Sequence, residues 1–224
     1  MRTWRVFSLA TMLSFLSLRG VVPAAEDGAP QTSADDNASN VEKPLMFSEA
    51  KLPEGFPPPG PVDRVVLKSY PAHRLARVSA DSGSNGMFMK LFRHIERNEI
   101  SMTAPVEMTW NPGAEEVATR PAGEPARMAF LYGSSTIGAT GPDPDDAQVM
   151  VEDVPEMKVV SVGIRGAYDA KGFSRGYDML ADWLAEHPEW KPAGPARTLG
   201  YNSPFVPVFA RFSEVQIPIV AASE

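Results

Sequence analysis

The sequence predicts a mixed α+β domain, built as a curved antiparallel sheet or distorted barrel with two helices packed on it. Strand-like runs stand before and after each of two amphipathic helical segments. Two helices are too few to cover both faces of a parallel sheet, which excludes a doubly wound fold. The same order of strands, one helix and strands occurs twice, which indicates a duplicated unit although the two halves share little sequence.

The first 25 residues have the pattern of a secretory signal peptide. Arg2 and Arg5 provide a basic start, residues 6–18 are apolar, and small residues at 22–25 offer a cleavage site. The apolar run is shorter than the roughly 20 residues that a membrane-spanning helix needs, so an uncleaved anchor is the weaker alternative. We therefore expect export, to a periplasm or out of the cell, and no membrane association after cleavage.

Charge and cysteine content restrict the possible partners. The chain has a net charge of −7, and cleavage would also remove Arg2, Arg5 and Arg19, which gives about −10 (−7 − 3). Such an acidic protein repels phosphate backbones, so nucleic acid is not expected as a partner. The absence of cysteine excludes disulfides, thiolate metal sites and a cysteine nucleophile.

Residues 26–61 are rich in Ala, Pro, Ser, Asp and Asn and end in the run GFPPPGP. Few of their side chains are suited to a core, so this segment is interpreted as a disordered acidic tether. The folded domain is then expected over residues 62–220.

The first half of the domain begins with strand signals at 62–70 and 73–80, followed by a turn cluster at 81–86. Residues 87–98 form an amphipathic helix, because five apolar side chains fall on one arc at helical spacing; they are Met87, Phe88, Leu91, Phe92 and Ile95. Residues 99–110, EISMTAPVEMTW, then return as a strand. Pro105 lacks a backbone donor, so it must lie where the ladder needs none. A structural role is favoured for this return over contact with a ligand.

The second half has strand signals at 127–133, 149–154 and 157–169, a helix over 172–190, and final strands over 199–220. Loops are expected over 111–125 and 140–148, where Pro and Gly are frequent. In the helix, apolar residues recur at 173, 177, 180 and 184, and Pro188 marks its end.

Four of these segments in their order are similar to the SOUL heme-binding protein family. They are YPAHRLARVSA (70–80), the helix and return at 86–106, residues 142–168 and residues 200–219. The resemblance implies a distorted antiparallel barrel of about eight strands in two related halves, flanked by two helices. It also implies non-covalent binding of a tetrapyrrole, heme, in a shallow hydrophobic groove beside the first helix, with no shared catalytic machinery.

One edge of the first helix offers the groups that heme needs: an apolar shelf, cations for the propionates and an optional iron ligand. The candidates are Met87 and Leu91 for the shelf, Lys90 and Arg97 for the propionates, and His94 for the iron. Core packing of the apolar pair and solvation of the others are the alternatives. Some family members carry a histidine where this chain has Ser69, so binding here is expected without that ligand, and possible without any strong axial bond.

Other chemistries find less support. The chain has three histidines and lacks the HExxH and GxSxG motifs of zinc hydrolases and α/β-hydrolases. Methionines at 87, 89, 102 and 108 could carry copper, but core packing is the commoner use of methionine. We expect an exported heme carrier, buffer or scavenger rather than an enzyme. The alternative is an enzyme or binding module of the same fold that acts on another flat apolar molecule.

Overall fold

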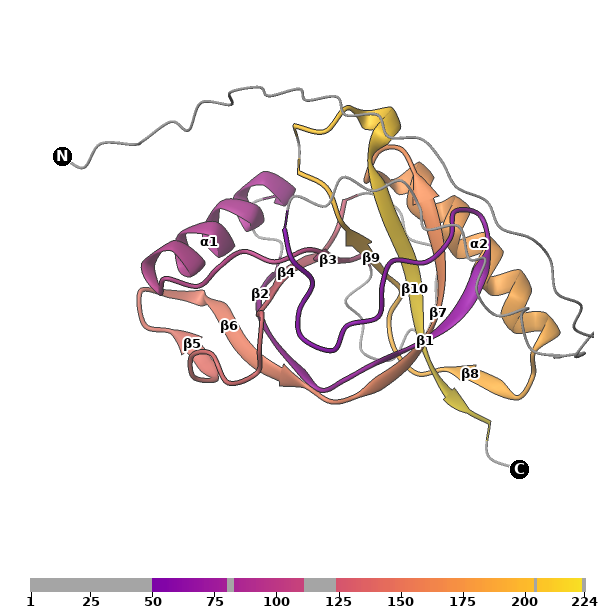
Figure 1. Cartoon of the computed structure of the whole chain (residues 1–224), viewed down its shortest axis with the longest axis horizontal. Coiled ribbons are helices and arrows are strands. Elements are labelled where there is room, and N and C mark those ends of the chain that lie inside the picture. Colours follow the sequence, from indigo (N-terminus) through magenta and orange to yellow (C-terminus); the bar gives the residue numbers. More distant parts are fainter. Residues whose placement is uncertain (1–49, 80–82, 111–123, 204, 223–224) are drawn as a thin grey trace, which may run out of the picture. The chain divides into compact units, whose positions relative to one another are not determined.

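A computed structural model describes residues 50–79, 83–110, 124–203 and 205–222. These residues form an α+β domain with two helices and an antiparallel sheet of ten strands, which confirms the predicted class (Figure 1). The predicted signal peptide and the first part of the predicted tether, up to residue 49, lie outside the described residues. Among the described residues, no helix is long and apolar enough to cross a membrane.

The elements follow one another in two runs. The first comprises β1 (Val65–Tyr70), β2 (His73–Ser79), α1 (Gly83–Arg97), β3 (Val106–Thr109), β4 (Arg127–Leu131), β5 (Gly141–Asp143) and β6 (Asp146–Val154). The second comprises β7 (Met157–Arg165), α2 (Ala170–Glu186), β8 (Trp190–Pro192), β9 (Arg197–Gly200), a 3-10 turn (Val208–Ala210) and β10 (Phe212–Ala221).

The strand order shows the duplication that the sequence indicated. The sheet runs β1-β7-β10-β9-β3-β4-β2-β6-β5, with β8 paired to β10. The unit β2-α1-β3-β4 and the unit β7-α2-β9-β10 have the same internal pairing, and β3 joins β9 between them. Within the described residues no ladder joins β1 to β5, so the sheet has ten strands and stays open, where a barrel of about eight was expected.

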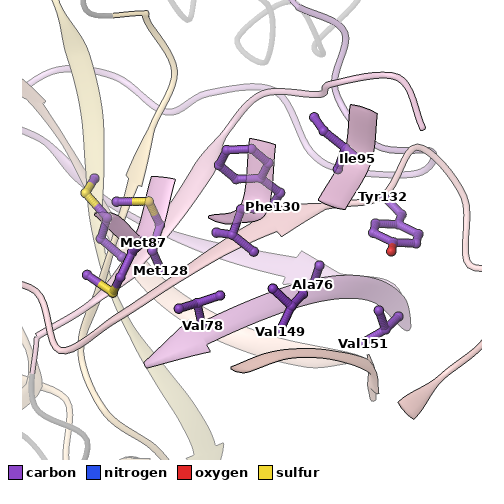
Figure 2. Packing of buried hydrophobic residues seen from close by; sticks show 11 residues of the cluster. Ala76, Val78, Met87, Ile95, Met128, Phe130, Tyr132, Val149 and Val151 are labelled. Carbon is purple, nitrogen blue, oxygen red and sulfur yellow. The ribbon is translucent and has the colours of Figure 1, made fainter. Parts of the chain in front are cut away.

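Both helices cover the same face of this sheet. Met108 of β3 belongs to the core cluster under α1, and its register partner Thr198 accepts a hydrogen bond from the indole of Trp110, which packs under α2. Figure 2 shows the α1 cluster, in which Met87 and Ile95 face strand residues that include Met128 and Phe130. Burial of this apolar face is the main reason that α1 is stable on the sheet.

Residues 50–61 pack against the opposite face of the sheet, so the prediction of a tether up to residue 61 is wrong for them. Phe56 meets the rings of Tyr70 and His73 edge-on, with ring centroids 4.9 and 5.0 Å apart. The amide of Gly163 donates to the carbonyl of Pro61 at 3.1 Å, and a Cβ at Gly163 would lie 2.5 Å from that oxygen. Composition alone misses such contacts because few apolar residues are needed to anchor an extended segment.

Candidate functional site

A cavity of about 1220 Å³ lies beyond the ends of β3, β4 and β9. Its size exceeds that of most small-molecule sites, which measure roughly 300–1,000 Å³, and its lining is mainly apolar. Large apolar side chains in its wall include Phe88, Phe92, Met102, Ile137 and Phe205. Four of these five are also among the large hydrophobic residues that remain exposed to solvent, Phe88 being the exception. The cavity is therefore an apolar surface that the described residues leave uncovered.

Helix α1 reaches this cavity with one edge of its apolar arc. Phe88 and Phe92 lie at that edge, and Phe88 packs edge-on against Phe130 with ring centroids 5.1 Å apart. Met87 and Leu91, the predicted shelf, lie at the other edge of the same arc. The helix wheel identifies the apolar arc correctly, but it does not say which edge the sheet will cover.

Met87 and Leu91, predicted as the apolar shelf, are fully buried in the core under α1. The sheet covers them because α1 packs on β2, β4 and β6, and Figure 2 shows Met87 directed toward Met128. The expectation that this edge faces a ligand is wrong, and core packing, the stated alternative, accounts for both residues.

His94 is also buried, and both of its ring nitrogens are occupied. Its Nδ1 lies 2.5 Å from Oδ2 of Asp143, and its Nε2 lies 2.7 Å from the hydroxyl of Tyr132. Burial alone would raise the pKa of Asp143, but hydrogen bonds from His94, the Asp145 amide and Arg97 lower it to about 2. The carboxylate of Asp143 is thus ionised and accepts a hydrogen bond from Nδ1. Because Nε2 is also bonded to the Tyr132 hydroxyl, both ring nitrogens of His94 are engaged within the protein.

Lys90 and Arg97, predicted to hold propionates, lie on the flank of α1 that faces β5 and β6. Lys90 Nζ donates to the side-chain oxygen of Gln148. Arg97 Nη2 donates to Asp143 at 2.7 Å. Neither residue lines the apolar cavity. This flank is a structural polar cluster that attaches α1 to the β5–β6 hairpin.

Two segments for which strands were predicted, the return after α1 and the start of the final strands, line the cavity instead. Residues 99–104 and Val106 form one wall, and Met102 in this segment is 39 % exposed. Residues 200–203 and Phe205 form another, with Phe205 92 % exposed. Met102 and Phe205 were the sequence signal that could have indicated this site, because large apolar side chains that stay exposed in loops often mark a binding surface.

One residue of the cavity wall, Tyr201, also belongs to a buried polar network on the face of the sheet opposite the helices. Tyr201 lines the cavity and donates its hydroxyl to Glu214 at 2.9 Å. Lys68 and Gln216 also donate to Glu214, at 2.5 and 3.0 Å. Burial and the charge of Glu214 raise the pKa of Tyr201 well above its usual value. Tyr201 is therefore a neutral phenol that is committed to this network.

A comparison with protein families identifies the family of this chain. The family model for the SOUL heme-binding protein matches residues 52–218, which is most of the described domain. The chain belongs to the SOUL heme-binding protein family. The match begins ten residues before the expected domain start, in agreement with the packing of residues 50–61 on the sheet. A search among curated proteins finds no match.

Solved structures share the fold of this SOUL domain at low identity. The EcmrR C-terminal domain is 14 % identical with a TM-score of 0.50, over 71 % of this chain and 98 % of that one. An uncharacterized conserved protein from Listeria innocua is 10 % identical with a TM-score of 0.51, over 71 % and 94 %. A protein from the same organism described as a hydrolase is 10 % identical with a TM-score of 0.50, over 72 % and 94 %. These similarities concern the fold alone.

Proposed function

We propose that the protein is an exported heme-binding protein, a carrier, buffer or scavenger, that holds heme in the apolar cavity beside α1. Membership of the SOUL heme-binding family supports the ligand, and the uncovered apolar cavity supports the place. The cavity is the observation that carries the proposal, because burial of a porphyrin against its walls can supply several kcal/mol without covalent attachment at about 25 cal/mol per Å².

The lining residues fit heme in size and chemistry. Aromatic rings at positions 88, 92 and 205 can pack on a flat porphyrin, and Lys51 at the rim provides an exposed cation for a propionate. Glu54 and Glu99 also lie at the rim, so the propionates are expected to point toward Lys51 and away from these carboxylates.

Binding rather than catalysis is the role that fits these side chains. Among the described residues no group of His, Asp and Glu side chains is arranged to hold a metal ion. The His94–Asp143 pair is engaged with Tyr132, which is 2 % exposed, and none of the three lines the cavity. We therefore propose no catalytic step for this chain.

Two exposed phenylalanines of one loop provide the test. Phe205 lines the cavity, whereas Phe209, 82 % exposed, does not. Titration of the chain from residue 26 onward with heme is expected to shift the Soret band, with affinity reduced about tenfold in Phe205→Ala and unchanged in Phe209→Ala. Equal affinities of the two variants would place heme elsewhere, and an unshifted band in the unmodified chain would reject heme binding.

Export is the second part of the proposal, and it rests on the basic and apolar pattern of residues 1–25. Protein purified from its own host is expected to begin near Glu26, which Edman or mass-spectrometric analysis of the N-terminus would reveal. An intact N-terminus in the cytoplasmic fraction would contradict export while leaving heme binding untouched. The acidic net charge of −7 is consistent with a small-molecule partner and not with nucleic acid.

A further inference from the structure

The histidines of this chain are held away from the cavity, which leaves the iron of a bound heme without an imidazole. His73 is buried on the other face of the sheet, with Nδ1 2.8 Å from the carbonyl of Pro71. His94 is bonded through both nitrogens to Asp143 and Tyr132. His187 stacks on Trp183 at the end of α2, with ring centroids 3.8 Å apart. None of the three appears in the wall of the cavity.

The donors that do line the cavity differ in kind. Tyr201 is neutral and donates its hydroxyl to Glu214. Thr103 donates its hydroxyl to the carbonyl of Leu131 at 2.5 Å. Glu54 and Glu99 offer carboxylates, which are hard donors suited to hard cations. The thioether of Met102 is the soft donor of this wall.

Met102 is also held firmly where it stands. The two residues that follow it are both hydrogen-bonded. The hydroxyl of Thr103 donates to the Leu131 carbonyl of β4, and the amide of Ala104 donates to the carbonyl of Lys51 at 3.0 Å. These bonds attach the segment to the sheet and to residues 50–54, so the 39 % exposed side chain of Met102 lines the cavity from a fixed backbone. A donor on a fixed backbone costs less ordering entropy on binding than one on a free loop.

We propose that Met102 is an axial ligand of the iron and that the cavity therefore prefers ferrous heme; this inference rests on the proposed heme binding. A thioether is soft and uncharged, so it binds Fe(II) better than Fe(III) and raises the reduction potential of the heme it ligates. The ligand class is thereby narrowed from tetrapyrroles in general to reduced iron porphyrin.

The experiment compares two ligands and two variants. Met102→Leu keeps an apolar side chain of similar size but removes the sulfur. Met89→Leu is the matched control, because Met89 is 45 % exposed on α1 and does not line the cavity. Each protein is titrated with ferrous heme under reducing conditions and with metal-free protoporphyrin, and the reduction potential of bound heme is measured.

The expected result is selective. Met102→Leu weakens ferrous heme binding about tenfold, leaves protoporphyrin binding unchanged and lowers the reduction potential of the bound heme, whereas Met89→Leu changes none of these. If the unmodified chain binds heme but Met102→Leu binds both ligands as tightly and at the same potential, the inference is overturned and the proposed function stands. If Met102→Leu weakens both ligands equally, Met102 contributes packing only, which also overturns it. If the unmodified chain binds neither ligand, the proposed function itself is wrong and this inference fails with it.

Discussion

Phe88 and Phe92 lie one turn apart on α1, with ring centroids 6.3 Å apart and ring planes inclined by 12°. The two rings have different surroundings. Phe88 packs against Phe130 of β4, whereas Phe92 is 38 % exposed toward the cavity. The pair thus joins the core under α1 to the apolar cavity, and Phe92 is the member that a ligand can cover.

Replacing Phe92 is expected to weaken ligand binding with little effect on stability. Phe92→Ala removes an aromatic wall of the cavity, which should raise the Kd for heme about tenfold. The measurement is a Soret-band titration beside Met89→Ala, a substitution on the solvent side of the same helix. A similar affinity loss in both variants would show that the effect comes from α1 as a whole.

Leu91→Ala is expected to destabilise the fold, because Leu91 is fully buried under α1. Removing a buried leucine side chain typically costs about 2–5 kcal/mol of unfolding free energy, since it loses apolar burial and leaves a cavity. Urea denaturation followed by circular dichroism measures this cost. If Leu91→Ala lowers the unfolding free energy less than the exposed Phe92→Ala does, the buried edge of α1 contributes little to the stability of the domain.

The stability of the domain should fall in acid as Asp143 becomes protonated. Its pKa is about 2 in the folded protein against 3.8 for an ordinary aspartate, so the unfolded chain binds more protons as the pH drops from about 5 toward 2. The contribution of Asp143 is therefore complete above its unfolded pKa and lost as the pH falls through its folded pKa. Urea midpoints measured from pH 6 to pH 2.5 should fall with pH for the unmodified chain.

Asp143→Asn removes this titration, so the decline of its urea midpoint below pH 4 should be shallower. The variant should also start from lower stability at pH 6, because His94 and Arg97 lose their ionised partner. Asp182→Asn is the control, since Asp182 is an exposed aspartate on α2. If the urea midpoints of Asp143→Asn and of the unmodified chain fall equally with pH, Asp143 is not the group whose protonation destabilises the fold.

Glu214 is expected to be the costliest carboxylate to neutralise. It is fully buried and accepts from Lys68, Tyr201, Gln216 and the amide of Gly60. Glu214→Gln leaves the Lys68 ammonium without its charge partner, which typically costs about 3–5 kcal/mol for a buried pair. Urea unfolding beside the exposed Glu156→Gln provides the comparison, and equal stabilities would rule out a structural role for the pair.

The segment before β1 is expected to stabilise the domain although its composition resembles a linker. Phe56→Ala removes the ring that meets Tyr70 and His73 and should cost about 2 kcal/mol, since the side chain is half-buried. A chain that begins at residue 50 should be more stable than one that begins at residue 62. Equal thermal midpoints for these two truncations would show that residues 50–61 do not stabilise the domain and act only as a tether.

Local patterns predicted much of the fold. The two amphipathic helices, the antiparallel strands between them and the duplicated order all follow from spacing within short segments. The open sheet did not follow, because closure depends on whether β1 and β5 can pair across the whole domain. The role of residues 50–61 did not follow either, since Gly60 and Glu214 are 154 residues apart in the chain.

The apolar cavity lies beside the helix on which the candidate site was predicted, but at the other edge of the apolar arc. Asp143 on β5 engages His94, and Gln148 on β6 engages Lys90, so the edge that carries those residues is turned to the sheet. No property of α1 alone encodes these partners, which come from a hairpin about 50 residues later. Met102, which lines the cavity, was not among the predicted site residues, because a structural role was favoured for its segment over contact with a ligand.

Four residue pairs, Val106–Thr109 of β3 with Arg197–Gly200 of β9, join the two duplicated units within the sheet. Val106 and Gly200 form the pair at one end of this seam, and both line the apolar cavity. Each unit therefore contributes one side of the cavity at this seam, Val106 from β3 and Gly200 from β9. A molecule bound there would contact both units at once, so its binding is expected to stabilise their pairing.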